Sequence, residues 1–184
     1  MRCRGLCAVL LSALALPFCG RAEAPKLSGA AEAAEKEPVL TGRVTRDELE
    51  EAMPSWMGAM VEAEIDREAA VALASVEPGA EVTIVLGTWC SDSGREVPRF
   101  WRALDEVGGL VPFEIGYLAV DREKEEPAEL LAGLDLEYVP TFLVRRGGEE
   151  VGRVVESAPG GIERDLLALL TGESQGTITG REDL

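Results

Sequence analysis

Residues 82–98 read VTIVLGTWCSDSGREVP and carry the strongest structural signal in the chain. The run from Val82 to Leu86 is apolar and rich in β-branched side chains, which is typical of a strand buried in the centre of a sheet. Gly87 begins a short loop that contains Cys90, and the composition of residues 91–107 favours a helix. We therefore expect a strand, a loop and a helix in succession, with Cys90 where the strand gives way to the helix.

A helical region is expected before this unit. Thr45 and Glu48 fit a capping box, in which each side chain bonds the other's backbone N–H at the start of a helix. Leu49, Met53, Trp56 and Met60 then recur at helical spacing. We interpret this stripe as core packing, with a partner-binding face as the alternative.

Strands and helices alternate through the rest of the chain. The glycine pair at 147–148 predicts a hairpin turn between two strands. The remaining expected elements are helices at 65–76, 127–131 and 162–170, and strands at 113–120, 142–144 and 150–155. This order predicts an α/β fold with a central mixed β-sheet flanked by helices.

The composition divides the chain after its first segment into four regions. Residues 25–38 are rich in Ala, Glu and Lys and are expected to form a flexible linker. Residues 39–78 form an N-terminal helical extension, and residues 79–171 form the α/β domain. Residues 172–184 are a polar tail that we expect to be frayed.

The first 24 residues have the pattern of a secretory signal peptide. Arg2 and Arg4 precede an apolar run from Leu6 to Leu16, and an A-x-A signal predicts cleavage after Ala24. The run is shorter than the roughly 20 residues that a membrane-spanning helix needs, which weakens the alternative of an uncleaved anchor. We therefore expect a periplasmic or extracellular protein.

A lipoprotein acylated on Cys19 is a weaker alternative, because bulky residues precede this cysteine where a lipobox has small ones. Cleavage after Ala24 removes Cys19 together with Cys3 and Cys7. Cys90 would then be the single cysteine, and a lone thiol cannot form an internal disulfide.

The charge and the missing residue types exclude several function classes. The chain has 18 Lys and Arg against 34 Asp and Glu, a net charge of −16, which argues against a nucleic-acid partner. It has no histidine, which removes His-based triads and His-ligated metal sites. The acidic run 121–126 lacks the glycine of a calcium loop, since Glu126 stands in its place. Nothing in the sequence specifies a metal or another cofactor.

Several local patterns resemble thioredoxin-like proteins. The residues Trp89-Cys90-Ser91-Asp92-Ser93 are similar to the family's Trp-Cys-x-x-Cys motif, and Pro98 stands where the family has a proline in its helix. Val139-Pro140-Thr141 resembles the family's cis-proline loop. The resemblance covers about residues 80–171, and residues 87–98 also resemble a bacterial subgroup of secreted thioredoxin-like proteins. It implies a thioredoxin-like fold and a role in cell redox homeostasis.

The sequence departs from that family at three positions. Ser93 replaces the resolving cysteine, Ile84 replaces a buried acid, and Tyr117 aligns with a lysine near that acid. In the family, the acid and the lysine help to deprotonate the resolving cysteine. The three losses are therefore coherent, because no second thiol remains to be activated.

The resemblance implies that Cys90 is the nucleophile of a thiol–disulfide exchange. A helix N-terminus favours a thiolate, and a hydrogen bond from Ser93 to the sulfur would add to this effect, whereas the nearby carboxylate of Asp92 opposes it. Without a resolving cysteine, a mixed disulfide on Cys90 waits for an external thiol. We expect monothiol exchange and not a self-sufficient dithiol reductase.

The expected partners are protein disulfides and thiols, or small thiols. By resemblance, Trp89, Val139, Pro140 and Thr141 bind an extended peptide, with the Val139 backbone beside Cys90 if Pro140 is cis. Trp89 has a second interpretation, in which it only covers the core.

Two other functions remain open at this point. In the first, the domain is redox-inactive and binds peptides through the groove around Trp89 and Pro140. In the second, the Cys90 thiol is oxidised to a sulfenic acid and acts as a sensor.

Overall fold

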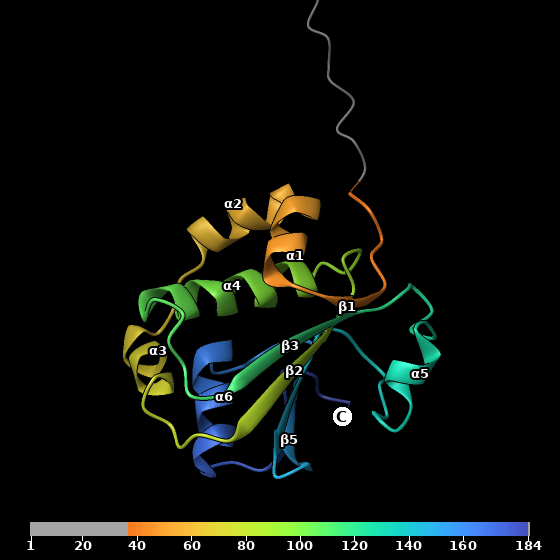
Figure 1. Cartoon of the computed structure of the whole chain (residues 1–184). Helices are drawn as coiled ribbons and strands as arrows, with labels where there is room; N and C mark the ends of the chain where they lie inside the picture. The colour runs from red at the N-terminus through yellow and green to blue at the C-terminus, as the bar shows by residue number, and fades with distance from the viewer. Residues whose placement is uncertain (1–36, 184) are drawn as a thin grey trace, which may run out of the picture. The chain divides into compact units, whose positions relative to one another are not determined.

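The computed structural model describes residues 37–183, which belong to one compact unit (Figure 1). The predicted signal peptide, the alternative lipidation at Cys19 and nearly all of the predicted linker fall in residues 1–36, outside the described residues. Within residues 37–183, no helix is both long enough and apolar enough to cross a bilayer.

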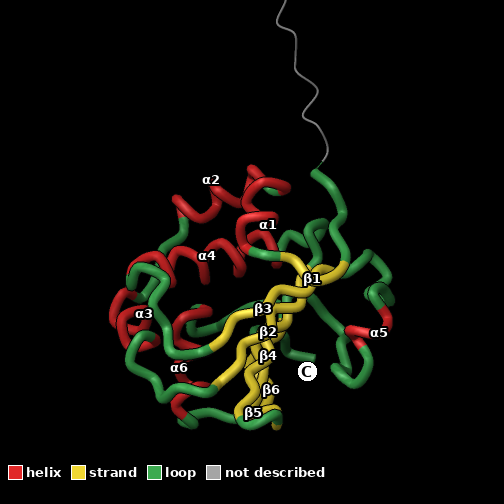
Figure 2. The backbone as a smooth tube through the Cα atoms, in the orientation of Figure 1, coloured by secondary structure: helices red, strands yellow, loops and turns green. Residues whose placement is uncertain are grey.

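The described chain is built on a mixed sheet, which confirms the predicted α/β fold (Figure 2). Its strands lie in the order β1-β3-β2-β4-β5-β6. β2–β3 and β5–β6 are parallel, and the other neighbouring pairs are antiparallel. The strands are β1 (Gly42–Val44), β2 (Ala80–Leu86), β3 (Glu114–Ala119), β4 (Thr141–Arg146), β5 (Glu149–Val155) and β6 (Gly176–Thr179).

Helices cover both faces of this sheet unequally. One face carries α1 to α4 and α6, whereas the short α5 lies on the other side (Figure 1). The helices are α1 (Arg46–Ala52), α2 (Pro54–Glu62), α3 (Arg67–Leu73), α4 (Ser93–Glu106), α5 (Ala128–Leu131) and α6 (Ile162–Thr171). The predicted capping box is present at Thr45 and Glu48, where it starts α1.

The face under α1 to α4 and α6 holds a cluster that we call the large core. Phe100 of α4 and Phe142 of β4 meet edge to face in it, with ring centroids 5.7 Å apart. Leu49, Met53 and Trp56 belong to the same cluster and are 0–3% exposed. The prediction that this stripe packs in the core is confirmed, and the helical extension shares its core with the sheet.

The face under α5 holds a smaller apolar group, which we call the small cluster. Its buried members come from the middle strands, from the residue that follows β3 and from the loop before β4: Val85, Leu118, Val120, Leu134, Val139 and Leu143. Trp89 and Cys90 are partly buried against it. The small cluster is therefore the apolar surface next to the thiol.

The polar tail is more ordered than the sequence predicted. Residues 172–184 were expected to be frayed, but β6 pairs with β5 in parallel, with Ile178 opposite Val154. Gly152 permits this close approach, because a Cβ there would collide with the Gly176 backbone. Ile178 also packs against the large core.

A buried ion pair joins three helices on the large-core face. Glu163 of α6 is fully buried, and Arg99 of α4 donates to both of its carboxylate oxygens, at 2.8 and 3.1 Å. The backbone N–H of Asp66, which caps α3, donates to the same carboxylate at 2.7 Å. Because these bonds satisfy the charge, Glu163 ties α3, α4 and α6 together.

Candidate functional site

Cys90 lies in the turn that leads from β2 into α4. Its N–H donates to the carbonyl of Gly87, and its own carbonyl accepts from the N–H of Gly94, both at 3.0 Å. The residue is half-buried, and it is a free cysteine. The structure therefore confirms the predicted position of Cys90 in the loop between a strand and a helix.

The thiol faces the loop that precedes β4. The Cys90 Sγ lies 3.2 Å from the carbonyl oxygen of Val139, to which it donates a hydrogen bond. The Val139–Pro140 peptide bond is cis. The fold thus brings together the thiol and a backbone segment 49 residues away in the sequence.

Ser93 is buried below this turn. Its Oγ accepts a hydrogen bond from the N–H of Gly87 at 3.2 Å, and the side chain is 0% exposed. Among residues 37–183, no hydrogen bond joins Ser93 to the Cys90 sulfur, in contrast to the bond that the sequence suggested. The Gly87 N–H needs a partner inside the protein, and Ser93 supplies it.

Trp89 lies between the small cluster and the loop that follows β3. Its Nε1 donates to the carbonyl of Val120 at 3.1 Å, and the guanidinium of Arg122 lies 5.5 Å from its ring centroid. The ring also lies against Gly87, where a Cβ would come within 2.6 Å of it. Position 87 therefore needs glycine so that the indole can lie beside the thiol turn.

Asp92 is balanced by a cation that the sequence analysis did not single out. Its carboxylate forms an ion pair with Arg95, one turn further along α4, with 2.6 Å between Oδ1 and Nη1. Arg95 lies about half exposed. Part of the negative charge that would oppose a thiolate at Cys90 is therefore offset locally, to the limited extent that a surface pair allows.

Thr141 and Pro140 are bound into the protein's own hydrogen bonds. The Thr141 hydroxyl donates to the carbonyl of Tyr138 at 2.8 Å, and its side chain is 3% exposed. The Pro140 carbonyl accepts from the N–H of Glu156 at 2.8 Å. These bonds fix the loop that presents Val139 to the sulfur.

Two residues that differ from the family pattern lie side by side. Ile84 and Tyr117 are register partners across the parallel pair β2–β3. Ile84 is 0% exposed, and the Tyr117 hydroxyl accepts from Nε1 of Trp101 at 3.0 Å. Burial raises the pKa of Tyr117 to about 12. Where the resemblance places a buried acid and a lysine, this protein thus has two neutral side chains, Ile84 and Tyr117, that pack together.

Glu96 is a buried acid near the site that the sequence analysis missed. It lies one turn after Ser93 and is 5% exposed. Its Oε1 pairs with Arg95 at 2.9 Å, while its Oε2 has no hydrogen-bond partner among the described residues. Burial raises the pKa of this carboxyl. The sequence signal that could have identified Glu96 is its spacing of three residues from Ser93, which places both residues on the buried face of α4.

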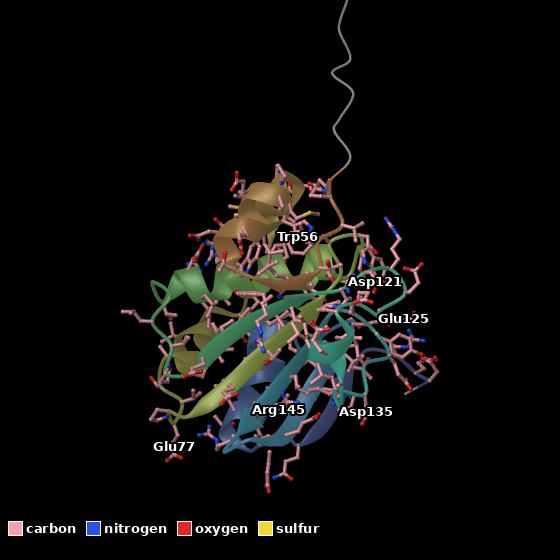
Figure 3. The ribbon with its side chains drawn as sticks, turned by 45° about the vertical axis from the view of Figure 1, so that its right-hand side comes forward. Trp56, Glu77, Asp121, Glu125, Asp135 and Arg145 are labelled. Atoms are coloured by element: carbon pink, nitrogen blue, oxygen red, sulfur yellow. The ribbon has the colours of Figure 1, made fainter. Side chains whose placement is uncertain are left out.

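The acidic loop after β3 is held by its own backbone (Figure 3). The Asp121 carboxylate accepts from the N–H groups of Glu125 and Glu126 at 2.8 and 2.9 Å, and the first of these pairs is labelled there. These bonds lower the pKa of Asp121. Within residues 37–183, no group of three or more Cys, Asp or Glu side chains is arranged to hold a metal ion.

Comparison with known proteins gives matches to thioredoxins. A thioredoxin-like protein of Acanthamoeba polyphaga mimivirus is 24% identical over 96 residues, 52% of this chain and 66% of the relative. A thioredoxin of Oryza sativa subsp. japonica is 32% identical over 92 residues, 50% of this chain and 62% of the relative. The chain therefore spans somewhat under two thirds of each relative's length.

The comparisons with family models and with solved structures give weaker similarity than these sequence matches. No family model matches the sequence. A Pseudomonas aeruginosa protein of unknown function aligns with a TM-score of 0.43 and 16% identity, over 71% of this chain and 82% of that one. A thioredoxin of Chlamydomonas reinhardtii aligns with a TM-score of 0.38 and 20% identity, over 60% of this chain and 94% of that one.

The sequence matches to thioredoxins agree with the α/β fold and with the Cys90 turn that faces a cis-proline loop. Over about half of the chain, these matches support a thioredoxin-like family.

Proposed function

We propose that the protein carries out monothiol–disulfide exchange through Cys90. The observation that carries this proposal is the position of the half-buried Cys90 thiol, in the turn that leads into α4, at the edge of the small cluster and next to the cis Val139–Pro140 bond. The names of the two curated relatives support thiol chemistry in general.

The exchange is balanced without an external oxidant. The Cys90 thiolate attacks one sulfur of a substrate disulfide, a Cys90–substrate disulfide forms, and the other substrate sulfur leaves as a thiolate that takes up a proton. Ser93 is buried and carries no thiol, so it cannot displace the substrate. A second, external thiol completes the cycle, and the substrates are protein or small-molecule disulfides.

A peptide substrate would reach the sulfur along the Val139–Pro140 loop. A substrate cysteine must approach the sulfur beside Val139, because the Val139 carbonyl lies against it. Backbone pairing with an extended peptide there would be a form of strand addition. Trp89 would then form one wall of the groove.

We also propose that the chain is exported by residues 1–24, which would place Cys90 in an oxidising compartment. Expression of the full chain, followed by cell fractionation and mass measurement of the mature N-terminus, tests this step. A mature chain that begins at residue 25 supports export, and a full-length cytoplasmic chain contradicts it.

The second candidate is a redox-inactive peptide-binding module. It is favoured by one observation, the engagement of the thiol by the Val139 carbonyl. In this case the loop would bind peptide and the sulfur would not react.

The experiment that separates the two candidates follows adducts on the folded protein by mass spectrometry. The chain without residues 1–24, which lacks Cys3, Cys7 and Cys19, is incubated with bis(2-hydroxyethyl) disulfide, and Cys90→Ser of the same chain serves as the control. We expect one mixed disulfide on the parent protein and none on Cys90→Ser. Folded protein that forms no adduct, while the urea-unfolded chain does, would refute exchange and favour the binding module.

The role of position 93 is tested by Ser93→Cys. A second thiol there should release the mixed disulfide internally and give measurable insulin reduction with a dithiol reductant, whereas Ser93→Ala should not. If Ser93→Cys folds and gains no activity, the neutral Ile84–Tyr117 pair matters more than the missing cysteine.

A further inference from the structure

The end of the chain places an arginine against the candidate site. After β6, the guanidinium of Arg181 lies 4.1 Å from the ring centroid of Tyr138. Its Nη1 forms an ion pair with Glu156 at 2.7 Å, and its Nη2 with Asp183 at 2.6 Å. In Figure 1 the chain accordingly ends beside β5, on the side of the sheet where α5 lies.

Two of the three groups that hold this cation, Tyr138 and Glu156, are attached to the loop that faces the thiol. Tyr138 directly precedes Val139, whose carbonyl contacts the Cys90 sulfur. The N–H of Glu156 donates to the carbonyl of Pro140. The aromatic ring and the carboxylate therefore flank the segment along which a substrate peptide would lie.

A pocket continues from Tyr138 along the same face of the sheet. It has a volume of about 150 Å³, and two carboxylate residues and one arginine are among the residues that line it. Its lining residues are Asp135, Glu137, Tyr138, Thr141, Arg153, Val155 and Thr177. Figure 3 shows Asp135 at this edge of the molecule. The guanidinium of Arg153 is already paired with Glu150, so the two carboxylates and the net charge of −16 favour cations over anions in this region.

We propose that Tyr138 and Glu156 form a subsite for a cationic side chain of the substrate, and that Arg181 occupies it in this structure as an internal ligand. The proposal rests on the proposed exchange at Cys90 and names its substrate class: disulfides with an arginine, lysine or other amine close to the reacting sulfur. The side chain of Arg181 then competes with the substrate for the subsite.

The contacts of the Arg181 side chain are weak enough for a substrate cation to displace it. Its ion pairs are partly exposed, since 28% of its side chain and 64% of that of Asp183 are open to solvent. Pairs of this kind contribute little in water, and a ring–cation contact adds a similar small amount. The preceding Gly180 is held to Ser157 by a backbone hydrogen bond at 3.1 Å, so the side chain can leave without unpairing β6.

The first test compares two disulfides that differ in charge. Cystamine carries an ammonium group near each sulfur, whereas bis(2-hydroxyethyl) disulfide is neutral. In each case Cys90 forms a mixed disulfide and one thiol is released. The experiment measures the ratio of the rate of adduct formation with cystamine to the rate with the neutral reagent.

We expect Arg181→Gln to raise this ratio about threefold to tenfold, because the subsite is vacated. Glu156→Gln should lower it below the parent value. Arg145→Gln changes the charge by the same amount as Arg181→Gln at the far end of β4, and it should leave the ratio unchanged. Equal ratios in the parent, Arg181→Gln and Glu156→Gln would overturn the subsite.

A second measurement does not depend on the thiol. The double variant Cys90→Ser, Arg181→Gln is titrated with the unreactive peptide acetyl-Gly-Arg-Gly-amide, and with its Gln counterpart, while the Tyr138 ring signals are followed by NMR. We expect a response to the arginine peptide alone, and no response refutes the subsite. A Tyr138 response in a protein whose Cys90 reacts with neither disulfide would refute the exchange and leave the subsite standing.

Discussion

The two faces of the sheet differ in how firmly they are covered. Five helices cover the large core, where Phe100, Trp101 and Phe142 are at most 1% exposed. The small cluster is covered by α5, which has four residues and none of them buried. Binding sites are commonly found on the less stable parts of a fold, and here the thiol lies on the thinly covered face. The large core and the candidate site therefore lie on opposite faces of the sheet, and the following predictions test whether the two faces are independent.

The largest effect is expected from Phe100→Ala in the large core. Removal of a fully buried aromatic ring leaves a cavity against Phe142 and should lower the free energy of unfolding by about 3–5 kcal/mol. Urea denaturation measures this loss, and Phe100→Leu should cost less. The Cys90 alkylation rate of the folded variant should match that of the parent protein. A changed rate would mean that the two faces are coupled.

A smaller loss of stability is expected from Leu134→Ala in the small cluster. Leu134 is 9% exposed and lies in the loop before β4, so its site can partly collapse, and the cost should be about 2 kcal/mol. In contrast to Phe100→Ala, this variant should alter the rate of Cys90 alkylation, because Val139 packs in the same cluster. An unchanged rate would show that the small cluster does not position the thiol.

Tyr117→Phe tests a buried polar contact of the large core. The substitution leaves Nε1 of Trp101 without its partner and should cost about 1–2 kcal/mol at neutral pH. The pKa of Tyr117 is about 12 in the folded protein against an ordinary value near 10, so the unfolded chain loses this proton first. Parent stability should therefore fall as the pH rises from about 10 to 12.

The phenylalanine variant lacks this ionisation, so its disadvantage should shrink in that pH range. Guanidinium denaturation at pH 9, 10.5 and 11.5 measures the difference between the two proteins. A constant difference would mean that Tyr117 ionises equally in the folded and unfolded states.

The smallest effect is expected from Glu96→Gln at the junction of the two regions. Burial raises the pKa of Glu96, so its contribution to stability is present below the ordinary glutamate pKa and is lost as the pH rises through the raised value. The neutral glutamine should thus stabilise the protein at pH 7 by less than about 1 kcal/mol, and this gain should vanish at acid pH.

Glu163→Gln is the matched control, because Glu163 is equally buried but fully paired. This variant loses charge-assisted bonds from Arg99 and should be destabilised at pH 7. If both glutamine variants shift stability in the same direction, the unpartnered oxygen of Glu96 is not what distinguishes the two acids.

Much of the fold could be predicted from local patterns. The strand before Gly87, the glycine hairpin and the capping box at Thr45 each depend on neighbours within a few residues, and all three are present. The short strands β1 and β6 were missed, because three or four residues carry too little periodicity to be recognised. Their pairing depends on the strands beside them.

The candidate site could likewise be predicted only in part. The sequence placed Cys90 at the start of a helix and showed that position 93 holds no second thiol. It could not show that the Ser93 oxygen serves Gly87, or that Glu96 is buried with one oxygen unpartnered. Both features depend on which side of α4 meets the rest of the protein.

By itself, the sequence determined the position of the candidate nucleophile Cys90 and the elements on either side of it, because turn chemistry and apolar spacing act over short distances. Only the tertiary structure brought Val139 to the sulfur across 49 residues and Arg181 to Glu156 across 25. Contacts at such separations are set by strand order and register, which no local pattern of residues encodes.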